Sequence, residues 1–179
     1  MNSPVLLAPP KFGLTLTRLC YELIETHDDF TDSVIIGLQP RGINLSKRLV
    51  GILNEIMPNQ KIWHGLLDNT FYRDDFRSHE STLVPSSTEI NFLVENKKVI
   101  LCDDVLFTGR TVRAGIDALL AFGRPSKVEL LVLVDRRFSR DLPIEPDYIG
   151  ISVDSRASQK VKVHWKESEG EDTVYMVTA

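Results

Sequence analysis

The chain has 179 residues, of which 42% are hydrophobic and 26% charged, and this composition is typical of one soluble globular domain with a continuous core. No apolar run is long enough to span a bilayer, and no basic segment precedes the short apolar patch near the N-terminus, so we expect neither a membrane anchor nor a secretory signal. The net charge of −4 excludes a general basic coat for nucleic acid but not a local basic patch. We interpret Cys20 and Cys102 as reduced core residues of a cytoplasmic protein.

Strand and helix patterns alternate along the first three quarters of the chain. In chain order, the apolar spacing predicts helix 14–27, a strand within 33–42 that ends in a Pro-Gly turn, helix 43–56, strand 61–68, strand 99–102, helix 110–122 and strand 127–134. This alternation predicts an α/β fold with a mostly parallel sheet covered by helices on both faces. The polar stretch 72–96 predicts a long excursion, and loops of this length are usually functional or disordered.

After residue 135 the alternation of strand and helix patterns gives way to short β stretches. Three short β stretches, at 147–153, 160–165 and 173–179, predict a C-terminal β subdomain. We therefore expect one domain, 1–179, with a core over about 14–135 and the subdomain over about 136–179.

Two adjacent carboxylates, Asp103 and Asp104, follow the apolar strand 99–102. Like charges about 4 Å apart repel by roughly 4 kcal/mol at an effective dielectric constant near 20, so a cation, hydroxyl donors or water must offset the repulsion. Ligands of parallel α/β sheets bind beyond the carboxyl ends of the strands. Carboxylates accept hydrogen bonds only, and a vicinal diol offers two donors, so the pair suits a ribose.

The segment after the acidic pair has the features of a phosphate site. Thr108, Gly109 and Thr111 precede or begin a helical pattern, where free backbone N–H groups and the helix dipole favour an anion. Taken singly, an acidic pair is often a surface feature and a Thr-Gly helix start is often only an N-cap. Together they favour a ribose 5-phosphate, and the sequence has neither a P-loop nor a dinucleotide fingerprint.

The stretch "VILCDDVLFTGRT", residues 99–111, resembles the signature of type I phosphoribosyltransferases, which bind phosphoribosyl pyrophosphate (PRPP). The segments "GLQPRGINLSKRL", "FYRDD" and "AGIDALLAFGRPSKVELLVLVDR", together with the length, resemble the PyrR family of bifunctional pyrimidine operon regulators and uracil phosphoribosyltransferases. The match extends from about Thr15 to Val163. It implies the type I fold, with a small C-terminal β hood over the base, and a dimer or a higher homo-oligomer.

The resemblance also implies roles for particular residues. Asp103 and Asp104 would hold the ribose hydroxyls, and Arg41 would contact the diphosphate unless it is only a surface charge. The pyrophosphate loop would be Gln39, Pro40, Arg41 and Gly42. The segment around the 5-phosphate would be Val105, Leu106, Phe107, Thr108, Gly109, Arg110 and Thr111.

Two further groups are implied by the same resemblance. Tyr72, Arg73 and Asp74 would belong to a flexible loop that closes over the substrate, unless Arg73 is merely solvated. Asp135, Tyr148 and Ile149 would lie where the family binds uracil, although Tyr148 is as well suited to the core.

The implied reaction is attack of uracil N1 on the anomeric carbon of PRPP, which yields UMP as pyrophosphate leaves. The transition state should resemble an oxocarbenium ion, as in glycoside chemistry. Arg41, Arg73 and magnesium would stabilise the leaving group. No side-chain spacing indicates a metal site, so we expect the magnesium ion to arrive with PRPP near Asp103 and Asp104.

Two alternatives stay open. The superfamily signature would also suit a purine enzyme that uses hypoxanthine or guanine. PyrR-like proteins also bind a leader-RNA hairpin when a uridine nucleotide occupies the active site, and RNA binding needs exposed cations. The candidates for phosphate contacts are Arg18, Lys47, Arg48, Arg136, Arg137 and Arg140.

Overall fold

Five parallel strands form the centre of the molecule in the computed structural model, which describes residues 4–74, 85–156 and 158–178. They lie in the order β3-β2-β4-β5-β6. Every residue of β2 is buried, which explains why its sequence, SVIIGL, is nearly all apolar. The strands are β2 (Ser33–Leu38), β3 (Trp63–Leu67), β4 (Lys98–Leu106), β5 (Lys127–Arg137) and β6 (Tyr148–Asp154).

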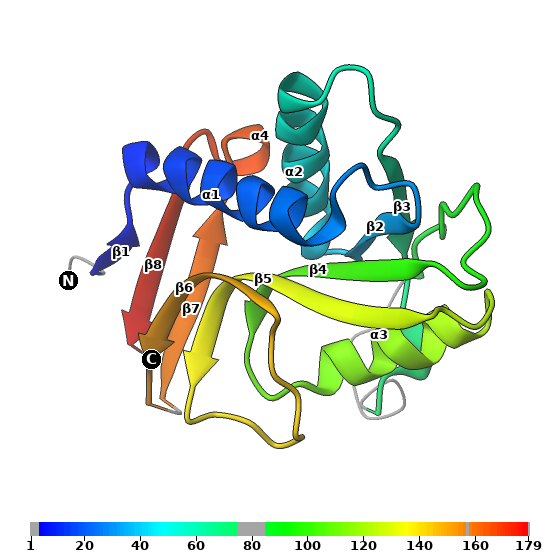
Figure 1. Ribbon diagram of the computed structural model, residues 1–179. Helices are drawn as coiled ribbons and strands as arrows, with labels where there is room; N and C mark the ends of the chain where they lie inside the picture. Colours follow the sequence, from blue (N-terminus) through cyan, green and yellow to red (C-terminus); the bar gives the residue numbers. More distant parts are fainter. Residues whose placement is uncertain (1–3, 75–84, 157, 179) are drawn as a thin grey trace.

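Helices cover both faces of this sheet, as the sequence predicted (Figure 1). α1 (Pro9–His27) and α2 (Gly42–Ile56) pack on one face, and α3 (Arg110–Leu120) packs on the other. The buried stripe of α1 has helical spacing, because Phe12, Leu16, Leu19 and Leu23 recur every three or four residues. α1 begins five residues earlier than predicted, and a proline occupies its first turn, where a missing N–H costs nothing.

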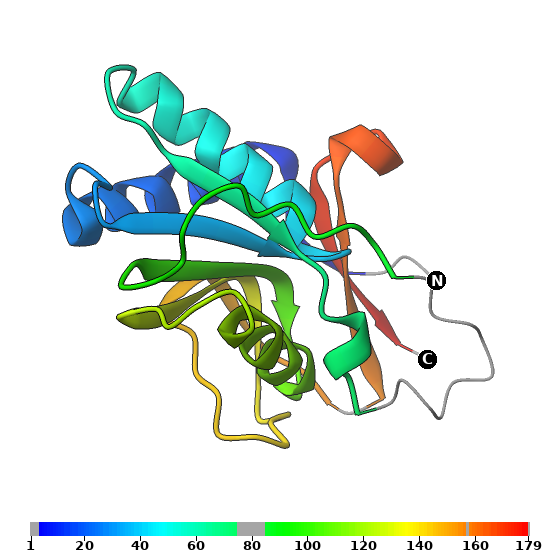
Figure 2. The same cartoon turned by 90° about the vertical axis from the view of Figure 1, so that its right-hand side faces the viewer.

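A second, antiparallel sheet of three strands forms the hood, in the order β1-β8-β7 (Figure 2). Its strands are β1 (Val5–Leu7), β7 (Gln159–His164) and β8 (Thr173–Thr178), and the short helix α4 (Lys166–Glu169) joins β7 to β8. The sequence analysis did not predict β1.

It also placed 147–153 in the C-terminal subdomain, whereas β6 pairs with β5 in the parallel sheet. β6 is an edge strand with several half-exposed residues, so its sequence lacks the continuous apolar run of a central strand.

The long excursion between β3 and β4 begins with the 3₁₀ helix η1 (Thr70–Tyr72). The predicted long loop spans 72–96, and its residues 75–84 lie outside the part of the chain that the structure describes. After that gap, the backbone of Glu89 forms an antiparallel bridge to Leu66, and Val94 is buried against the α3 side of the sheet. The described end of the excursion is therefore part of the core.

Candidate functional site

The two adjacent carboxylates lie within β4 rather than after it. Asp103 is 5% exposed and Asp104 is 7% exposed, and the Asp104 backbone N–H donates to Asp103 Oδ1 at 2.9 Å. β2 ends at Leu38, and its last pairing with β4 is at Cys102, so β4 continues beyond its neighbour at this point. The acidic pair thus stands where the centre of the sheet opens at its carboxyl edge.

Burial makes this pair electrostatically unfavourable without a ligand. Desolvation raises the pKa of Asp104 to about 6, although the charge of Arg41 opposes the shift. The pKa of Asp103 lies well above its usual value because of burial and the charge of Asp104, while Arg41 and Arg73 act in the opposite direction. The pair therefore favours any ligand that brings hydrogen-bond donors or positive charge.

A cavity of about 330 Å³ lies between the carboxyl edge of β4 and the hood. Arg41, Asp104 and Val105 line one side, while residues 161–164 of β7 and Glu169 of α4 line the other. The sequence analysis predicted that the hood covers the base, but it did not name these hood residues. The alternation KVKV in β7 indicates a strand and carries no chemical signature.

The turn between β2 and α2 brings Arg41 to this cavity. Gln39 is buried, and its Nε2 donates to the Ser87 carbonyl at 2.7 Å, so the described end of the excursion supports the turn. The Gln39–Pro40 peptide bond is cis, Arg41 is the N-cap of α2, and Gly42 begins the helix against the backbone of β4. The predicted pyrophosphate loop and the acidic pair therefore meet at one end of the sheet.

The segment from Phe107 to Thr111 connects the acidic pair to the N-terminus of α3. Gly109, the N-cap, has a φ of 89°, a conformation that favours glycine, and it has no side chain to satisfy the first turn of the helix. The Thr108 carbonyl accepts the backbone N–H groups of Asp141 and Leu142 at 3.0 and 3.2 Å. The loop is thus held from outside, and the first-turn N–H groups suit a phosphate.

The predicted base contacts do not gather at the same cavity. Asp135 and Ile149 line a second cavity of about 310 Å³, and of the described residues none lines both cavities. Asp135 is paired with Arg140, which also lines this second cavity.

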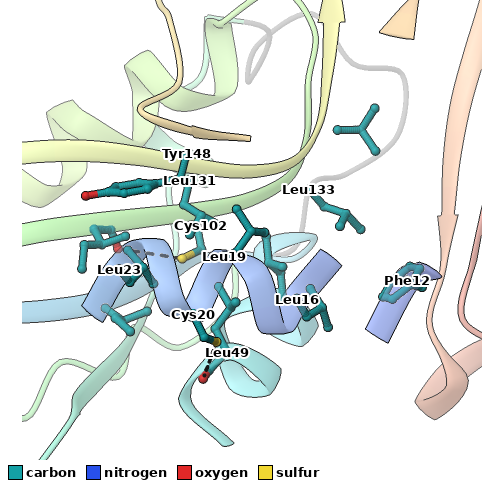
Figure 3. Packing of buried hydrophobic residues seen from close by; sticks show 14 of the residues in the cluster. Phe12, Leu16, Leu19, Cys20, Leu23, Leu49, Cys102, Leu131, Leu133 and Tyr148 are labelled. Atoms are coloured by element: carbon teal, nitrogen blue, oxygen red, sulfur yellow. Dashed lines mark hydrogen bonds between the residues drawn. The ribbon is translucent and has the colours of Figure 1, made fainter. Parts of the chain in front are cut away.

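Tyr148 lies in the core beneath α1, among buried leucines (Figure 3). Its hydroxyl is 3.1 Å from His27 Nε2 and 3.4 Å from Glu129 Oε2. Burial lowers the pKa of His27, although Glu129, whose Oε2 lies 2.8 Å from the same Nε2, acts in the opposite direction. The structure gives Tyr148 the core role that the sequence left open.

The basic cluster expected to contact RNA is largely internal. Arg136 is 5% exposed, its Nε donates to Ser155 Oγ at 2.9 Å, and its guanidinium lies 3.9 Å from the centre of the Phe107 ring. Arg140 pairs with Asp135 and donates to the Phe107 carbonyl at 2.6 Å. Both arginines therefore support the end of β5 and the segment around the proposed 5-phosphate site, and the candidate Arg136 is too buried to contact RNA.

Two further cations considered for RNA also have structural partners. Arg48 pairs with Glu167 within α4 and with Asp172 just after it, and Arg18 donates to two carbonyl groups of the edge strand β6. Lys47 and Arg137 are exposed, and Arg137 forms an ion pair with Asp154 at 2.7 Å. Within the described ranges, no helix is long and apolar enough to cross a membrane, and no three His, Cys, Asp or Glu side chains form a group that could hold a metal ion.

The fold and the site together define a type I phosphoribosyltransferase. Residues 5–168 match the family described as "Phosphoribosyl transferase domain". Solved structures share the fold: a hypoxanthine phosphoribosyltransferase from Staphylococcus aureus has a TM-score of 0.70 at 18% identity, covering 98% of this chain and 96% of its own. The enzyme from Trypanosoma cruzi has a TM-score of 0.71 at 14% identity, covering 97% of this chain and 95% of its own.

Curated relatives identify the family within the type I phosphoribosyltransferases. "Bifunctional protein PyrR" of Desulfosudis oleivorans is 47% identical over 91% of this chain and 90% of its own. The protein of the same name from Synechocystis is 38% identical over 96% and 95%, and that of Deinococcus radiodurans is 40% identical over 97% and 95%. The chain belongs to the PyrR family of phosphoribosyltransferases.

Proposed function

We propose that the protein transfers the 5-phosphoribosyl group of PRPP to uracil. The bond from C1′ to the diphosphate oxygen breaks, the bond from C1′ to uracil N1 forms, and the N1 proton is released, which gives UMP and pyrophosphate. The observation that carries this proposal is the buried pair Asp103 and Asp104, with Arg41 lining the same cavity.

Each part of PRPP has a counterpart at the carboxyl edge of the sheet. In this proposal Asp103 and Asp104 accept the ribose hydroxyls, and the first turn of α3 at Gly109 binds the 5-phosphate. Arg41, with Arg73 on the excursion, balances the charge that develops on the leaving diphosphate. This arrangement positions the reactants and stabilises charge, and it requires no covalent nucleophile.

Magnesium fits the chemistry of the site. Two buried carboxylates with raised pKa values gain from a nearby divalent cation, and carboxylate and phosphate oxygens are the ligands that magnesium prefers. We place the ion with PRPP near Asp103 and Asp104, where it supplies positive charge to the diphosphate.

The proposed location of the base differs from the one that the sequence suggested. We place uracil between Val105 and β7, because residues 161–164 face Asp104 across the 330 Å³ cavity. Backbone groups of β7 offer donors and acceptors to the edge of the ring. A purine as the substrate is not favoured, because the purine enzymes share the fold at 12–18% identity whereas the PyrR relatives share 38–47%.

A panel of labelled bases with PRPP and magnesium tests this proposal. We expect transfer to uracil to exceed transfer to hypoxanthine and guanine, and Asp104→Asn to lower it by at least about tenfold. Preferred transfer to a purine, or no transfer to any base, would overturn the assignment of the substrate.

We also propose a regulatory role in which a uridine nucleotide promotes binding to a leader-RNA hairpin of pyrimidine genes. Its support is the name "Bifunctional protein PyrR" of relatives that cover most of the chain. Of the cations that the sequence singled out, Lys47 and Arg137 are exposed, and we assign phosphate contacts to these two.

A gel-shift titration with such a hairpin, with and without UMP, tests the regulatory role. We expect Lys47→Ala combined with Arg137→Ala to flatten the salt dependence of binding by roughly one to two units, taking B-DNA as a guide. If no hairpin binds more tightly than about 10 µM at moderate salt, which lies in the non-specific range, this role is excluded.

A further inference from the structure

One carboxylate, Asp74, bridges two arginines of α3. Its Oδ2 lies 2.7 Å from Arg110 Nη1, and its Oδ1 lies 2.5 Å from Arg113 Nη2. Arg113 Nη2 also donates to the Tyr72 carbonyl at 3.0 Å. Asp74 and Tyr72 thus both connect the start of the excursion to α3.

A second contact fixes the other end of the same short segment. Asn69 is 1% exposed, and its Nδ2 donates to the Thr111 carbonyl at 2.9 Å. Residues 69–74 are therefore attached at both ends to the first turn of α3, which is the proposed site of the 5-phosphate. We call these contacts of Asn69, Tyr72 and Asp74 with α3 the excursion clamp.

Arg73 lies inside the excursion clamp, between Tyr72 and Asp74. Its charge lowers the pKa of Asp103, so the guanidinium is within electrostatic range of the acidic pair. The contacts of Asn69, Tyr72 and Asp74 with α3 give the backbone on both sides of Arg73 a defined position. The clamp thereby relates Arg73 to both the phosphate site and the carboxylates.

We propose that Asp74 is a positioning residue of the transferase, which holds Arg73 at the diphosphate of PRPP by tying the excursion to Arg110 and Arg113. This inference rests on the proposed function. Asp74 itself touches no substrate group in this proposal. It acts through its neighbour in the chain.

The exposure of the ion pairs indicates what the clamp contributes. The side chains of Asp74, Arg110 and Arg113 are 38%, 53% and 39% exposed. Ion pairs as exposed as these add little to global stability. Their effect on a catalytic group is larger, because a displacement of about 1 Å at an active site can lower the rate by up to about 100-fold.

The experiment compares Asp74→Asn with Asp117→Asn. Asp117 is the matched control, because it also pairs with Arg113, at 2.8 Å, yet it belongs to α3 and does not hold the excursion. We expect Asp74→Asn to lower kcat for UMP formation by about tenfold, within the range for displaced catalytic groups, with a smaller change in KM for uracil. Asp74→Glu should restore part of the rate, and Asp117→Asn should leave it unchanged.

A double-mutant cycle with Arg73→Ala distinguishes positioning from a general structural effect. If Asp74 acts through Arg73, then Asp74→Asn causes no further loss of activity or of magnesium–PRPP affinity once Arg73 is alanine. Equal losses in both backgrounds, or an equal effect of Asp117→Asn, would overturn the proposal. A large drop in the urea midpoint of Asp74→Asn would also overturn it, because the clamp would then be a structural element.

Failure of the proposed function can be distinguished from failure of the clamp by measuring PRPP binding. If the unmodified protein makes no UMP from uracil, calorimetry of magnesium–PRPP binding still reports on the clamp. It is applied to the four proteins of the cycle, which are the unmodified protein, Asp74→Asn, Arg73→Ala and the double variant. Weaker binding in Asp74→Asn, absent from the Arg73→Ala background, would then support the clamp alone. Identical affinities in all four would exclude it.

Discussion

The backbone of Gly42 lies so close to Cys102 that a Cβ on Gly42 would stand 2.1 Å from the Cys102 carbonyl oxygen. This close approach seats the start of α2, with Arg41 as its N-cap, beside the acidic pair of β4. The absence of one methyl group therefore sets the distance between the proposed diphosphate contact and the proposed ribose contact.

Replacing Gly42 by alanine should separate α2 from β4. We expect the free energy of unfolding to fall by about 1–3 kcal/mol, the usual cost of overpacking, and the KM for PRPP to rise. Gly51→Ala in the same helix is the control, because its added Cβ has no neighbour within 4 Å apart from adjacent residues and the backbone of its own helix. It should stabilise the protein by about 0.5–1 kcal/mol. Urea unfolding and steady-state kinetics measure both, and equal effects at the two positions would contradict the packing argument.

The double variant Asp103→Asn with Asp104→Asn should lose turnover while the fold stays intact. Amide groups replace acceptors by partial donors opposite a diol. Each hydrogen bond to a charged group contributes about 1.5–3 kcal/mol, so we expect the loss of two such bonds to lower turnover by at least a few hundredfold. Calorimetry with magnesium and PRPP, together with circular dichroism, checks both parts. An unchanged affinity for PRPP would remove these residues from the ribose site.

The stability of the ligand-free protein should depend on pH through Asp104. Its pKa in the folded protein is raised to about 6, against about 3.9 in an unfolded chain, so the folded state binds more protons between these values. Asp104 alone should therefore lower the free energy of unfolding by about 2–3 kcal/mol as pH rises from about 4 to about 6, and the raised pKa of Asp103 acts in the same direction.

Urea unfolding of the unmodified protein and of Asp104→Asn between pH 4 and pH 7 measures this dependence. His27 has the opposite effect, since its lowered pKa costs stability as the pH falls below about 6.5, but it is present in both proteins and cancels in the difference. Parallel curves for the two proteins would contradict the assignment of the slope to Asp104.

Tyr148→Phe separates the core role of this tyrosine from a role in base binding. Removing the hydroxyl deprives His27 and Glu129 of a partner and should cost about 0.5–1.5 kcal/mol of stability. The KM for uracil should not change. A raised KM with normal stability would return Tyr148 to the base site, and thermal unfolding alongside uracil titration distinguishes the two outcomes.

Arg48 should control how firmly the hood is attached. Its guanidinium pairs with Glu167 at 2.7 Å and with Asp172 at 2.7 Å, and it lies 5.6 Å from the centre of the Trp165 ring. We expect Arg48→Ala to cost about 1–3 kcal/mol and to raise the KM for uracil, because β7 forms one wall of the cavity. Arg48→Lys should restore only part of the stability, since lysine cannot bind two carboxylates with a planar fork. Unchanged kinetics in Arg48→Ala would show that the hood holds its position without this contact.

Much of the fold could be predicted because its signals are local. The buried strands β2, β4 and β5 have continuous apolar runs, and the stripe of α1 has helical spacing. The edge strand β6 was assigned to the wrong sheet because strand pairing is a non-local choice that half-exposed residues do not specify. The three residues of β1 were missed because their role depends on β8, at the far end of the sequence.

The site also has a part that the sequence could predict and a part that it could not. Asp103, Asp104 and the segment 108–111 form one continuous motif whose chemistry follows from its residue types. Residues 161–164, the proposed wall of the base site, have no such motif, since their position opposite Asp104 depends on the attachment of the hood. The arginines at 136 and 140 resembled a surface cluster in the sequence, and only the tertiary structure shows that Ser155, Asp135 and the Phe107 carbonyl bind them.

The order of strands in the hood determines when the cavity can form during synthesis. β8, the central strand of the hood, pairs with β1 on one side and with β7 on the other, yet it is the last of the three to be translated. The parallel sheet, with its acidic pair, can therefore assemble on the ribosome while β1 and β7 still lack their shared partner. The chain acquires its proposed ribose and phosphate contacts first, and it gains the wall that encloses the base only when residues 173–178 have emerged.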